Sequence, residues 1–200
     1  MIVLLDNGHG SLIAGTYQTS GKRSPQWENK SQLFEGEFNR AIVNGLIEEL
    51  TRLKIPYVNI APEYTDISLE TRVKRANKYA TKNSFYLSIH SNAGGGNGVE
   101  IFTSVGLTLS DSIATIFGEE FQKLFPNKKL RTDFTDKDMD KEKNFFVLNK
   151  TLMPSILTEN FFMDNEDECK SLLMSYEGRR KIIQYHLKAI IRVKNEIFNN

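Results

Sequence analysis

The chain has little cysteine, no long apolar run and almost no net charge, and each shortage excludes a class of protein. Its 200 residues include one cysteine, Cys169, so no disulfide can form within the chain. Lysine and arginine total 26 against 25 aspartates and glutamates. This balance argues against binding nucleic acid mainly through its phosphates, which needs a basic excess. No apolar run approaches the roughly 20 residues of a membrane-spanning helix.

The N-terminal apolar run is too short for a signal peptide. Residues 2–5 are apolar and are followed at once by Asp6, whereas a signal peptide needs about 7–15 apolar residues. We therefore expect a protein that is synthesised in the cytoplasm without a signal peptide. We also expect it to bind neither membrane nor nucleic acid and to be a monomer.

The length and the order of the expected elements predict one domain. Domains average roughly 150 residues, and no repeat, low-complexity tract or linker divides the chain. Short apolar runs typical of strands alternate with amphipathic stretches typical of helices. This alternation predicts a single α/β domain over residues 1–200, with a mostly parallel, twisted sheet of about six strands flanked by helices. The expected strands are 2–5, 56–60, 85–90, 99–103, 145–148 and 155–162.

Apolar residues at helical spacing predict four helices, near 38–53, 69–80, 113–124 and 182–197. Two stretches lack such periodicity. Residues 10–34 are polar and contain glycines and a proline, so we expect a long surface loop. Residues 127–144 are dense in charges of both signs, so we expect a solvated connection.

Three reactive side chains fall at or near the expected strand ends. His9 follows the first strand between two glycines, His90 ends the third, and Glu159 lies in the apolar run of the last. Ligands of open α/β sheets bind beyond the carboxyl ends of the strands, so the three residues predict one site. Two histidines and a carboxylate form a common zinc ligand set, and catalytic zinc sites keep a further position open for water.

The carboxylate ligand cannot be chosen from chemistry alone. Glu35 and Glu37 both lie at the expected start of the first helix, and Glu28 lies in the loop before it. Asn92, just past His90, is a further candidate, either for substrate contact or for capping the loop.

Four motifs occur in a characteristic order: residues 6–10 (DNGHG), Glu35 followed by Asn39, residues 88–93 (SIHSNA) and residues 154–159 (PSILTE). Together they resemble the zinc-dependent N-acetylmuramoyl-L-alanine amidases, the catalytic domains of bacterial cell-wall amidases and phage endolysins. The resemblance extends from residue 1 to about residue 175. Asn7, Asn149 and Phe161 depart from it, since the family usually has proline, arginine and glycine there.

The resemblance implies a site and a reaction. It implies the zinc ligands His9, Glu35 and His90 and the catalytic acid/base Glu159. The Asn39 spacing favours Glu35 over Glu37. The implied cofactor is Zn²⁺, and the implied reaction is cleavage of the peptidoglycan amide between N-acetylmuramic acid and L-alanine of the stem peptide.

The implied role is that of a phage or prophage endolysin, or another lytic enzyme, acting at the bacterial cell wall. One alternative is a zinc hydrolase of another amide, either carboxypeptidase-like or an N-acyl-amino-acid deacylase. Another is a wall-binding module without catalysis. Regulated members of the family block the zinc with an extra helix; residues 127–144 are too polar to resemble it, so we expect an open site.

Three further residues receive no catalytic role. His186 lies on the apolar stripe of the last expected helix, so we expect a packed histidine. Cys169 follows three acidic residues, whose charge is expected to raise the pKa of its thiol and keep it unreactive. Trp27, the only tryptophan, either stacks on a sugar or holds its loop in place.

Overall fold

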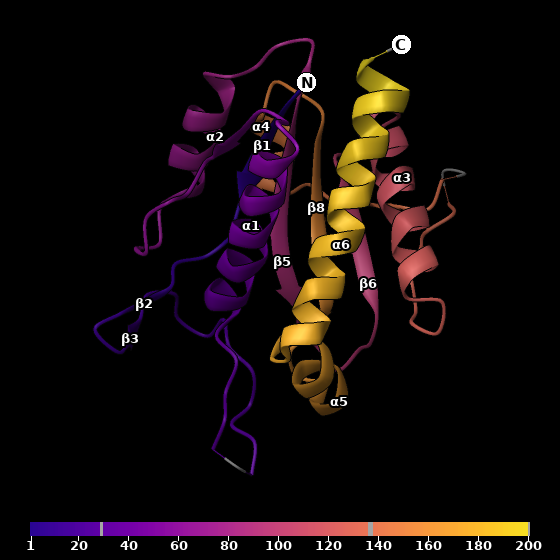
Figure 1. The fold of residues 1–200 in the computed structure, drawn as a ribbon. Helices are drawn as coiled ribbons and strands as arrows, with labels where there is room; N and C mark the ends of the chain where they lie inside the picture. The colour runs from indigo at the N-terminus through magenta and orange to yellow at the C-terminus, as the bar shows by residue number, and fades with distance from the viewer. Residues whose placement is uncertain (29, 136–137, 200) are drawn as a thin grey trace.

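The computed structural model describes residues 1–28, 30–135 and 138–199. A six-stranded sheet in the order β4-β1-β5-β8-β6-β7 forms its centre (Figure 1). Neighbouring strands are parallel except β6 and β8, which are antiparallel. The predicted α/β class and mostly parallel sheet are therefore confirmed. In chain order the strands are β1 (Ile2–Asp6), β4 (Tyr57–Asn59), β5 (Ser84–Asn92), β6 (Val99–Thr103), β7 (Lys141–Glu142) and β8 (Ser155–Phe162).

Helices cover both faces of this sheet. Successive residues of a strand point to opposite faces, so Val3 and Leu5 join a core with α1, α3 and α6, whereas Leu4 joins a second core with α2 and α4. Among the described residues, no helix is long and apolar enough to cross a membrane. The helices are α1 (Glu35–Arg52), α2 (Leu69–Asn77), α3 (Leu109–Leu124), α4 (Phe146–Lys150), α5 (Glu166–Glu168) and α6 (Tyr176–Val193), and π-helical turns continue α5 and α6 over Cys169–Leu173 and Lys194–Phe198.

The expected strand at 145–148 is wrong: most of this segment belongs to α4. A short apolar run does not distinguish a strand from a buried helical turn. Here Val147 and Leu148 pack on the α2 side of the sheet. The sixth strand is instead β7, an edge strand that pairs with β6. Its side chains are charged, and an edge strand pairs through its backbone without needing apolar side chains.

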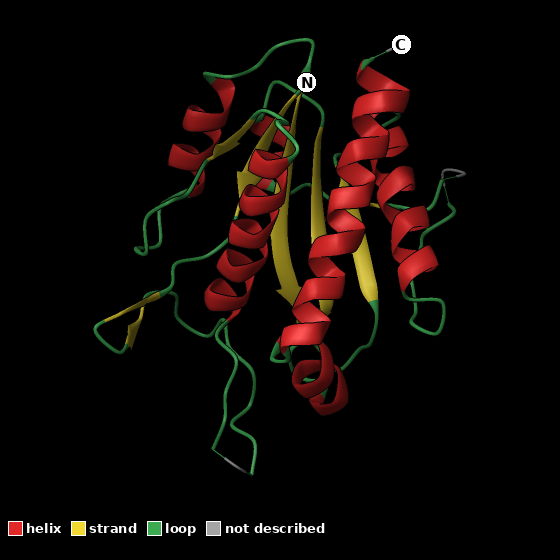
Figure 2. Cartoon of the chain, in the orientation of Figure 1, coloured by secondary structure: helices red, strands yellow, loops and turns green. Residues whose placement is uncertain are grey.

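The two aperiodic stretches are more ordered than the sequence predicts. Within 10–34, β2 (Leu12–Ile13) and β3 (Thr16–Tyr17) form a small hairpin away from the main sheet (Figure 2). The stretch 127–144 is not simply solvated, because Leu130 pairs with β6 and Asp140 is only 2% exposed.

Cys169, expected to be unreactive, lies in the main core, and Trp27 packs against it. Cys169 is buried, and its pKa is raised as expected. The cause differs from the expected one, however, since burial raises the pKa and the neighbouring charges that act on the thiol are the cations Lys170 and Arg179. Trp27 is half-buried and packs against the same core, which favours its holding the loop in place.

His186 is a packed histidine, as expected. It is fully buried, with Nε2 3.0 Å from the Thr158 hydroxyl and Nδ1 2.8 Å from the Ile182 carbonyl oxygen. Burial lowers the pKa of this imidazole to about 4. The folded protein therefore resists its protonation.

This resistance gives a prediction for stability against pH. Above pH 6.5 His186 is neutral in both the folded and the unfolded chain. As the pH falls from 6.5 towards 4, only the unfolded chain takes up the proton, so the free energy of unfolding falls by up to about 3 kcal/mol. Urea unfolding at pH 7, 5.5 and 4.5 measures this loss. In His186→Gln the loss of unfolding free energy should be smaller by about that amount. If the free energy of unfolding fell equally with pH in both proteins, His186 would not be its cause.

Candidate active site

Three side chains that lie far apart in the sequence meet at the carboxyl end of the sheet. His9 lies in the turn after β1, Glu35 is the first residue of α1, and His90 lies near the end of β5. Glu35 Oε1 is 3.2 Å from His9 Nε2 and 3.0 Å from His90 Nδ1. One donor atom from each of the three residues lies within 4.8 Å of the others. The predicted set is therefore brought together in space.

The protonation states of this cluster follow from burial and hydrogen bonding. Burial alone would raise the pKa of Glu35, but hydrogen bonds with both histidines outweigh it and hold that pKa well below its ordinary value. Burial lowers the pKa of His90. The cluster thus offers an ionised carboxylate and a neutral imidazole, together with the second imidazole of His9. This donor set, converging on one point, fits zinc.

Gly8 allows the two histidines to approach each other. Its φ is +64°, and a Cβ at this position would lie 2.4 Å from Cε1 of His90. The rings of His9 and His90 pack edge to face with their centroids 4.9 Å apart. Any residue larger than glycine would therefore displace a member of the cluster.

A buried ion pair holds this turn, and sequence reasoning missed it. Asp6 accepts hydrogen bonds from the Arg72 guanidinium, the Tyr86 hydroxyl and, at 3.2 Å, the N–H of Gly8. Asp6 and Arg72 are each about 1% exposed. Asp6 lies in the motif at residues 6–10, but nothing in the sequence pairs it with Arg72, which lies far along the chain.

Breaking this pair should destabilise the fold. In Arg72→Met the Asp6 carboxylate stays buried without its cation, so we expect the free energy of unfolding to fall by about 3–5 kcal/mol. Arg75→Met, in the same helix, removes the partly exposed pair with Glu63 and should cost at most about 1 kcal/mol. Urea unfolding compares the two variants. If both variants lost the same free energy of unfolding, the buried Asp6–Arg72 pair would contribute no more to stability than the exposed pair.

Glu159 lies beside the cluster, opposite His90 in the parallel pairing of β5 with β8. Its Oε2 is buried and has no hydrogen-bond partner among the described residues. Burial, and then the negative charge of Glu35, raises the pKa of Glu159 well above its ordinary value. The carboxyl group is thus suited to hold a proton and give it up.

A cavity of about 660 Å³ opens over these groups, within the size range of small-molecule sites. Lys22, Leu69 and the α4 residues Phe146 and Val147 form part of its wall. The described residues of 127–144 do not line it, and the expected open site stays a prediction.

Glu100 is a second residue that sequence reasoning missed. It lies opposite Glu159 on β6 and is 7% exposed. Its Oε1 accepts from Arg131 at 2.8 Å and from Lys141 at 2.6 Å, both in the stretch expected to be solvated. Its Oε2 accepts from the Asn92 amide at 2.6 Å.

These bonds change the interpretation of two residues. Burial raises the pKa of Glu100, but the bonds outweigh it and keep that pKa low, so the carboxylate beside Glu159 is ionised and balanced by cations. Asn92 also accepts from the N–H of Ala93 and does not line the cavity. The structure therefore gives Asn92 a role in the loop, and its predicted contact with substrate stays a prediction.

The three candidate glutamates occupy different positions relative to the histidines. Only Glu35 reaches the histidines. Glu37 accepts from the Ser11 hydroxyl and, at 2.8 Å, from the N–H of Leu12, so it holds the loop; Glu28 is exposed. Asn39, which favoured Glu35 by its spacing, is buried one turn further along α1, and its amide has no partner among the described residues.

Phe161, one of the departures noted in the sequence, has a φ of +58°, the left-handed region that favours glycine. It lies where the pairing of β5 with β8 changes register. Its ring is fully buried against Phe121 and Phe125. The aromatic packing offsets the backbone strain at this position.

Comparison with known proteins assigns the family. The model of the N-acetylmuramoyl-L-alanine amidase family matches residues 3–192. The chain belongs to this family. It is 31% identical over 175 residues to the N-acetylmuramoyl-L-alanine amidase CwlM of Bacillus licheniformis, which covers 86% of this chain and 61% of that protein. It is 28% identical over 203 residues to the endolysin of Bacillus phage SPP1, which covers 97% of this chain and 66% of the endolysin.

The amidase fold is also found in solved structures. The N-acetylmuramoyl-L-alanine amidase of Clostridium difficile 630 superposes with a TM-score of 0.76 at 22% identity, covering 98% of this chain and 97% of the other. The chain spans about three fifths of the length of CwlM. The structural similarity concerns the fold of this amidase domain.

Proposed function

We propose that this amidase-family chain is a zinc-dependent hydrolase that cleaves the peptidoglycan amide between N-acetylmuramic acid and L-alanine of the stem peptide. The observation that carries the proposal is the placement of Glu159. Glu159, whose Oε2 is buried and unpaired among the described residues, lines the same cavity as His9 and His90, and the donors of these two histidines converge with that of Glu35. The expected acid/base and the expected ligands thus share one site.

The ligand set would be the two imidazoles and the Glu35 carboxylate. When bound there, zinc supplies a Lewis acid that polarises a carbonyl group and lowers the pKa of water. The buried pair of Asp6 and Arg72 holds the turn that carries His9, and α1 and β5 hold the other two ligands. The chain thereby fixes the donors before substrate arrives.

Glu159 would move the proton. Its carboxylate takes a proton from the attacking water and holds it in the buried pocket, where the acid form is favoured. It then delivers this proton to the departing amide nitrogen, so that the peptide leaves as an amine. The apolar side chains of Leu69 and Phe146 border the same cavity.

The proposed role is lysis of the bacterial cell wall, as an endolysin or an autolysin. The similarity to the SPP1 endolysin along 97% of this chain and to the Bacillus amidase CwlM supports it. We propose that the domain acts on peptidoglycan as a monomer, outside the cytoplasm in which it is made, without binding membrane or nucleic acid.

Mass spectrometry of the products from purified peptidoglycan tests the reaction. The digest is run with zinc, with a chelator, and with Glu159→Ala. We expect stem peptides with a free N-terminal L-alanine only in the zinc sample with intact Glu159. Products cut at another amide would favour a different zinc hydrolase. Binding to the wall with no product in any sample would favour a binding module.

A further inference from the structure

Three aspartates meet at a second place, outside the catalytic cavity. Asp111 lies in the first turn of α3, and Asp138 and Asp140 lie just before β7. One carboxylate oxygen from each lies within 4.8 Å of the others. Asp111 and Asp140 are 7% and 2% exposed, so two of the three carboxylates are buried; Asp111 and Asp138 line a pocket that opens to the surface.

Each aspartate keeps one oxygen without a partner. Asp111 uses Oδ2 to accept from the N–H of Thr108 in the capping box of α3, and Asp140 uses Oδ2 to accept from the Thr103 hydroxyl. The Oδ1 atoms of all three aspartates are buried and have no hydrogen-bond partner among the described residues. Buried carboxylate oxygens without partners are costly, so the cluster needs a cation or protons to neutralise it.

Within the described ranges, no protein cation neutralises the three aspartates. None of the ion pairs among residues 1–28, 30–135 and 138–199 includes Asp111, Asp138 or Asp140. The neighbouring Lys141 bonds to Glu100, and Lys143 lies over the rings of two phenylalanines. Among the described residues, the three carboxylates therefore face one another without a protein cation beside them, and burial together with the neighbouring Asp138 raises the pKa of Asp140 to about 7.

We propose that these aspartates bind a divalent cation, with Ca²⁺ as the preferred ion. All the donors are oxygens, which hard cations prefer over the nitrogen ligands that suit zinc. Oxygens on opposite sides of a calcium ion lie up to about 5 Å apart at its usual bond lengths, so the observed spacing accommodates calcium. Water completes the coordination shell from the open side of the cluster.

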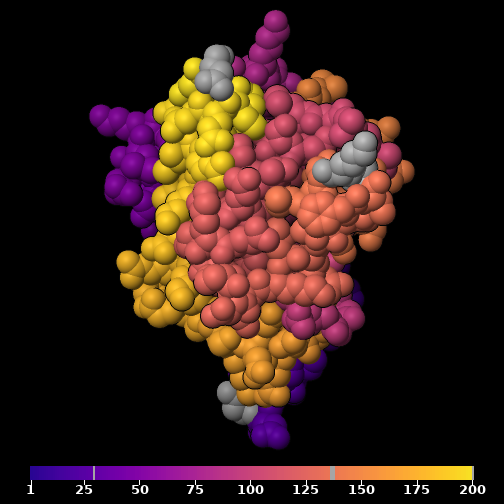
Figure 3. All heavy atoms as spheres, turned by 90° about the vertical axis from the view of Figure 1, so that its right-hand side faces the viewer, coloured from indigo at the N-terminus to yellow at the C-terminus, as the bar shows by residue number. Residues whose placement is uncertain are grey.

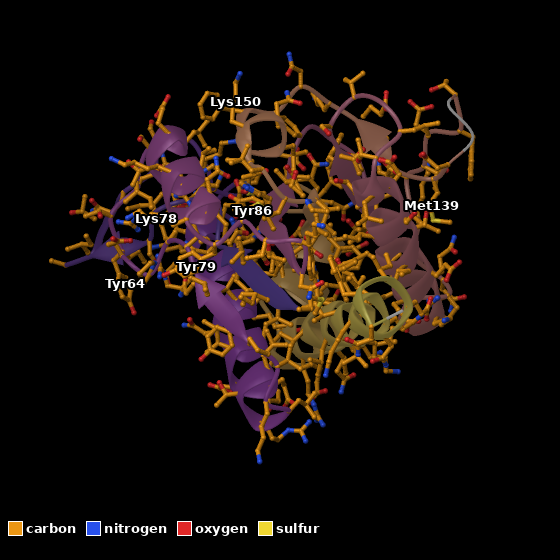
Figure 4. All side chains as sticks on the ribbon, turned by 90° about the horizontal axis from the view of Figure 1, so that it is seen from above. Tyr64, Lys78, Tyr79, Tyr86, Met139 and Lys150 are labelled. Carbon is orange, nitrogen blue, oxygen red and sulfur yellow. The ribbon has the colours of Figure 1, made fainter. Side chains whose placement is uncertain are left out.

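The ion would fasten the charged stretch to α3. Met139, between two of the ligands, already lies against this helix: a Cβ on Gly118 would be 2.6 Å from its sulfur, and Figure 4 shows its side chain beside α3. In Figure 3, α3 and the residues after it form a continuous surface on this side of the molecule. The stretch leads through β7 to α4 and so to one wall of the catalytic cavity.

Thermal unfolding of the zinc-loaded full chain tests the site with CaCl₂ as the probe and MgCl₂ for comparison. We expect Ca²⁺ at about 100 times its Kd to raise Tm by roughly 5–10 °C, and Mg²⁺ to raise it less. Titration calorimetry should show one calcium per chain. Zinc content and wall lysis are measured in the same samples, so a failure of calcium binding leaves the proposed hydrolase unaffected, and the converse also holds.

Asp138→Asn is the diagnostic variant, and Asp133→Asn, an exposed aspartate in the same stretch, is its matched control. Without calcium, Asp138→Asn should be at least as stable as the unaltered chain, because one repelling charge is gone. With calcium its Tm should not rise, whereas Asp133→Asn should respond fully. No calcium response in the unaltered chain, or equal responses in the two variants, would overturn the proposal and leave protons as the groups that neutralise the cluster.

Discussion

Replacing Glu159 by glutamine is expected to slow peptidoglycan cleavage by about 10²–10⁴-fold while zinc stays bound. Glutamine keeps the shape of the side chain but cannot carry the proton from water to the leaving nitrogen. It also removes a carboxyl group whose ionisation is opposed by burial and by Glu35, so the variant should be at least as stable as the unaltered chain. Release of soluble stem peptide measures the rate, and metal analysis measures the zinc.

The matched control is Glu177→Gln, which alters an exposed glutamate in α6 and should keep full activity. A Glu159→Gln protein that retains activity within a few-fold would show that another group moves the proton. A protein that loses zinc along with activity would instead place Glu159 among the ligands. The two readouts together therefore separate acid/base chemistry from metal binding.

Loss of His90 is expected to remove both zinc and activity. Residues that merely support a metal ligand change affinity by about 10–100-fold, so His90→Ala, which removes a ligand, should weaken zinc binding by more than about 100-fold. After dialysis, zinc should fall from about one per chain to a small fraction of that. Treating the unaltered chain with a chelator should abolish activity, and added zinc should restore it.

His186→Gln provides the control for this prediction, because it removes a histidine that packs in the core and takes no part in the cluster. It should keep its zinc and its activity at pH 7. If His90→Ala still bound one zinc tightly, or if the chelated chain remained active, the proposed ligand set would be wrong.

Much of the fold follows from local patterns in the sequence. The alternation of apolar runs with helical stripes predicted the α/β class, and five of the six expected strands overlap observed strands. The failure at 145–148 has a physical cause, since four apolar residues satisfy the burial pattern of a strand and of a short helix equally. The edge strand β7 carried no signal, because its pairing uses the backbone and its side chains are charged.

The site was predictable where it depended on motifs at strand ends. His9, His90 and Glu159 were found because ligands of this fold class bind at one edge of the sheet, and those residues lie where strands approach that edge. The pairs Asp6–Arg72 and Glu100–Arg131 were not found, since each joins segments that meet only in the folded chain. The same is true of the aspartates that we propose to bind calcium.

The sequence by itself determined the layered α/β architecture, the family and the residue types of the candidate catalytic site, because periodicity and motifs are local properties. Only the tertiary structure decided that Glu35 rather than Glu37 reaches the histidines. It also showed that the Asn92 amide donates a hydrogen bond to Glu100. The charged residues 127–144 contribute a strand to the edge of the sheet and two aspartates to the acidic cluster. The physical reason is the same in each case: burial and the approach of partners distant in the chain fix the pKa values and contacts, and these arise only when the sheet and its helices pack together.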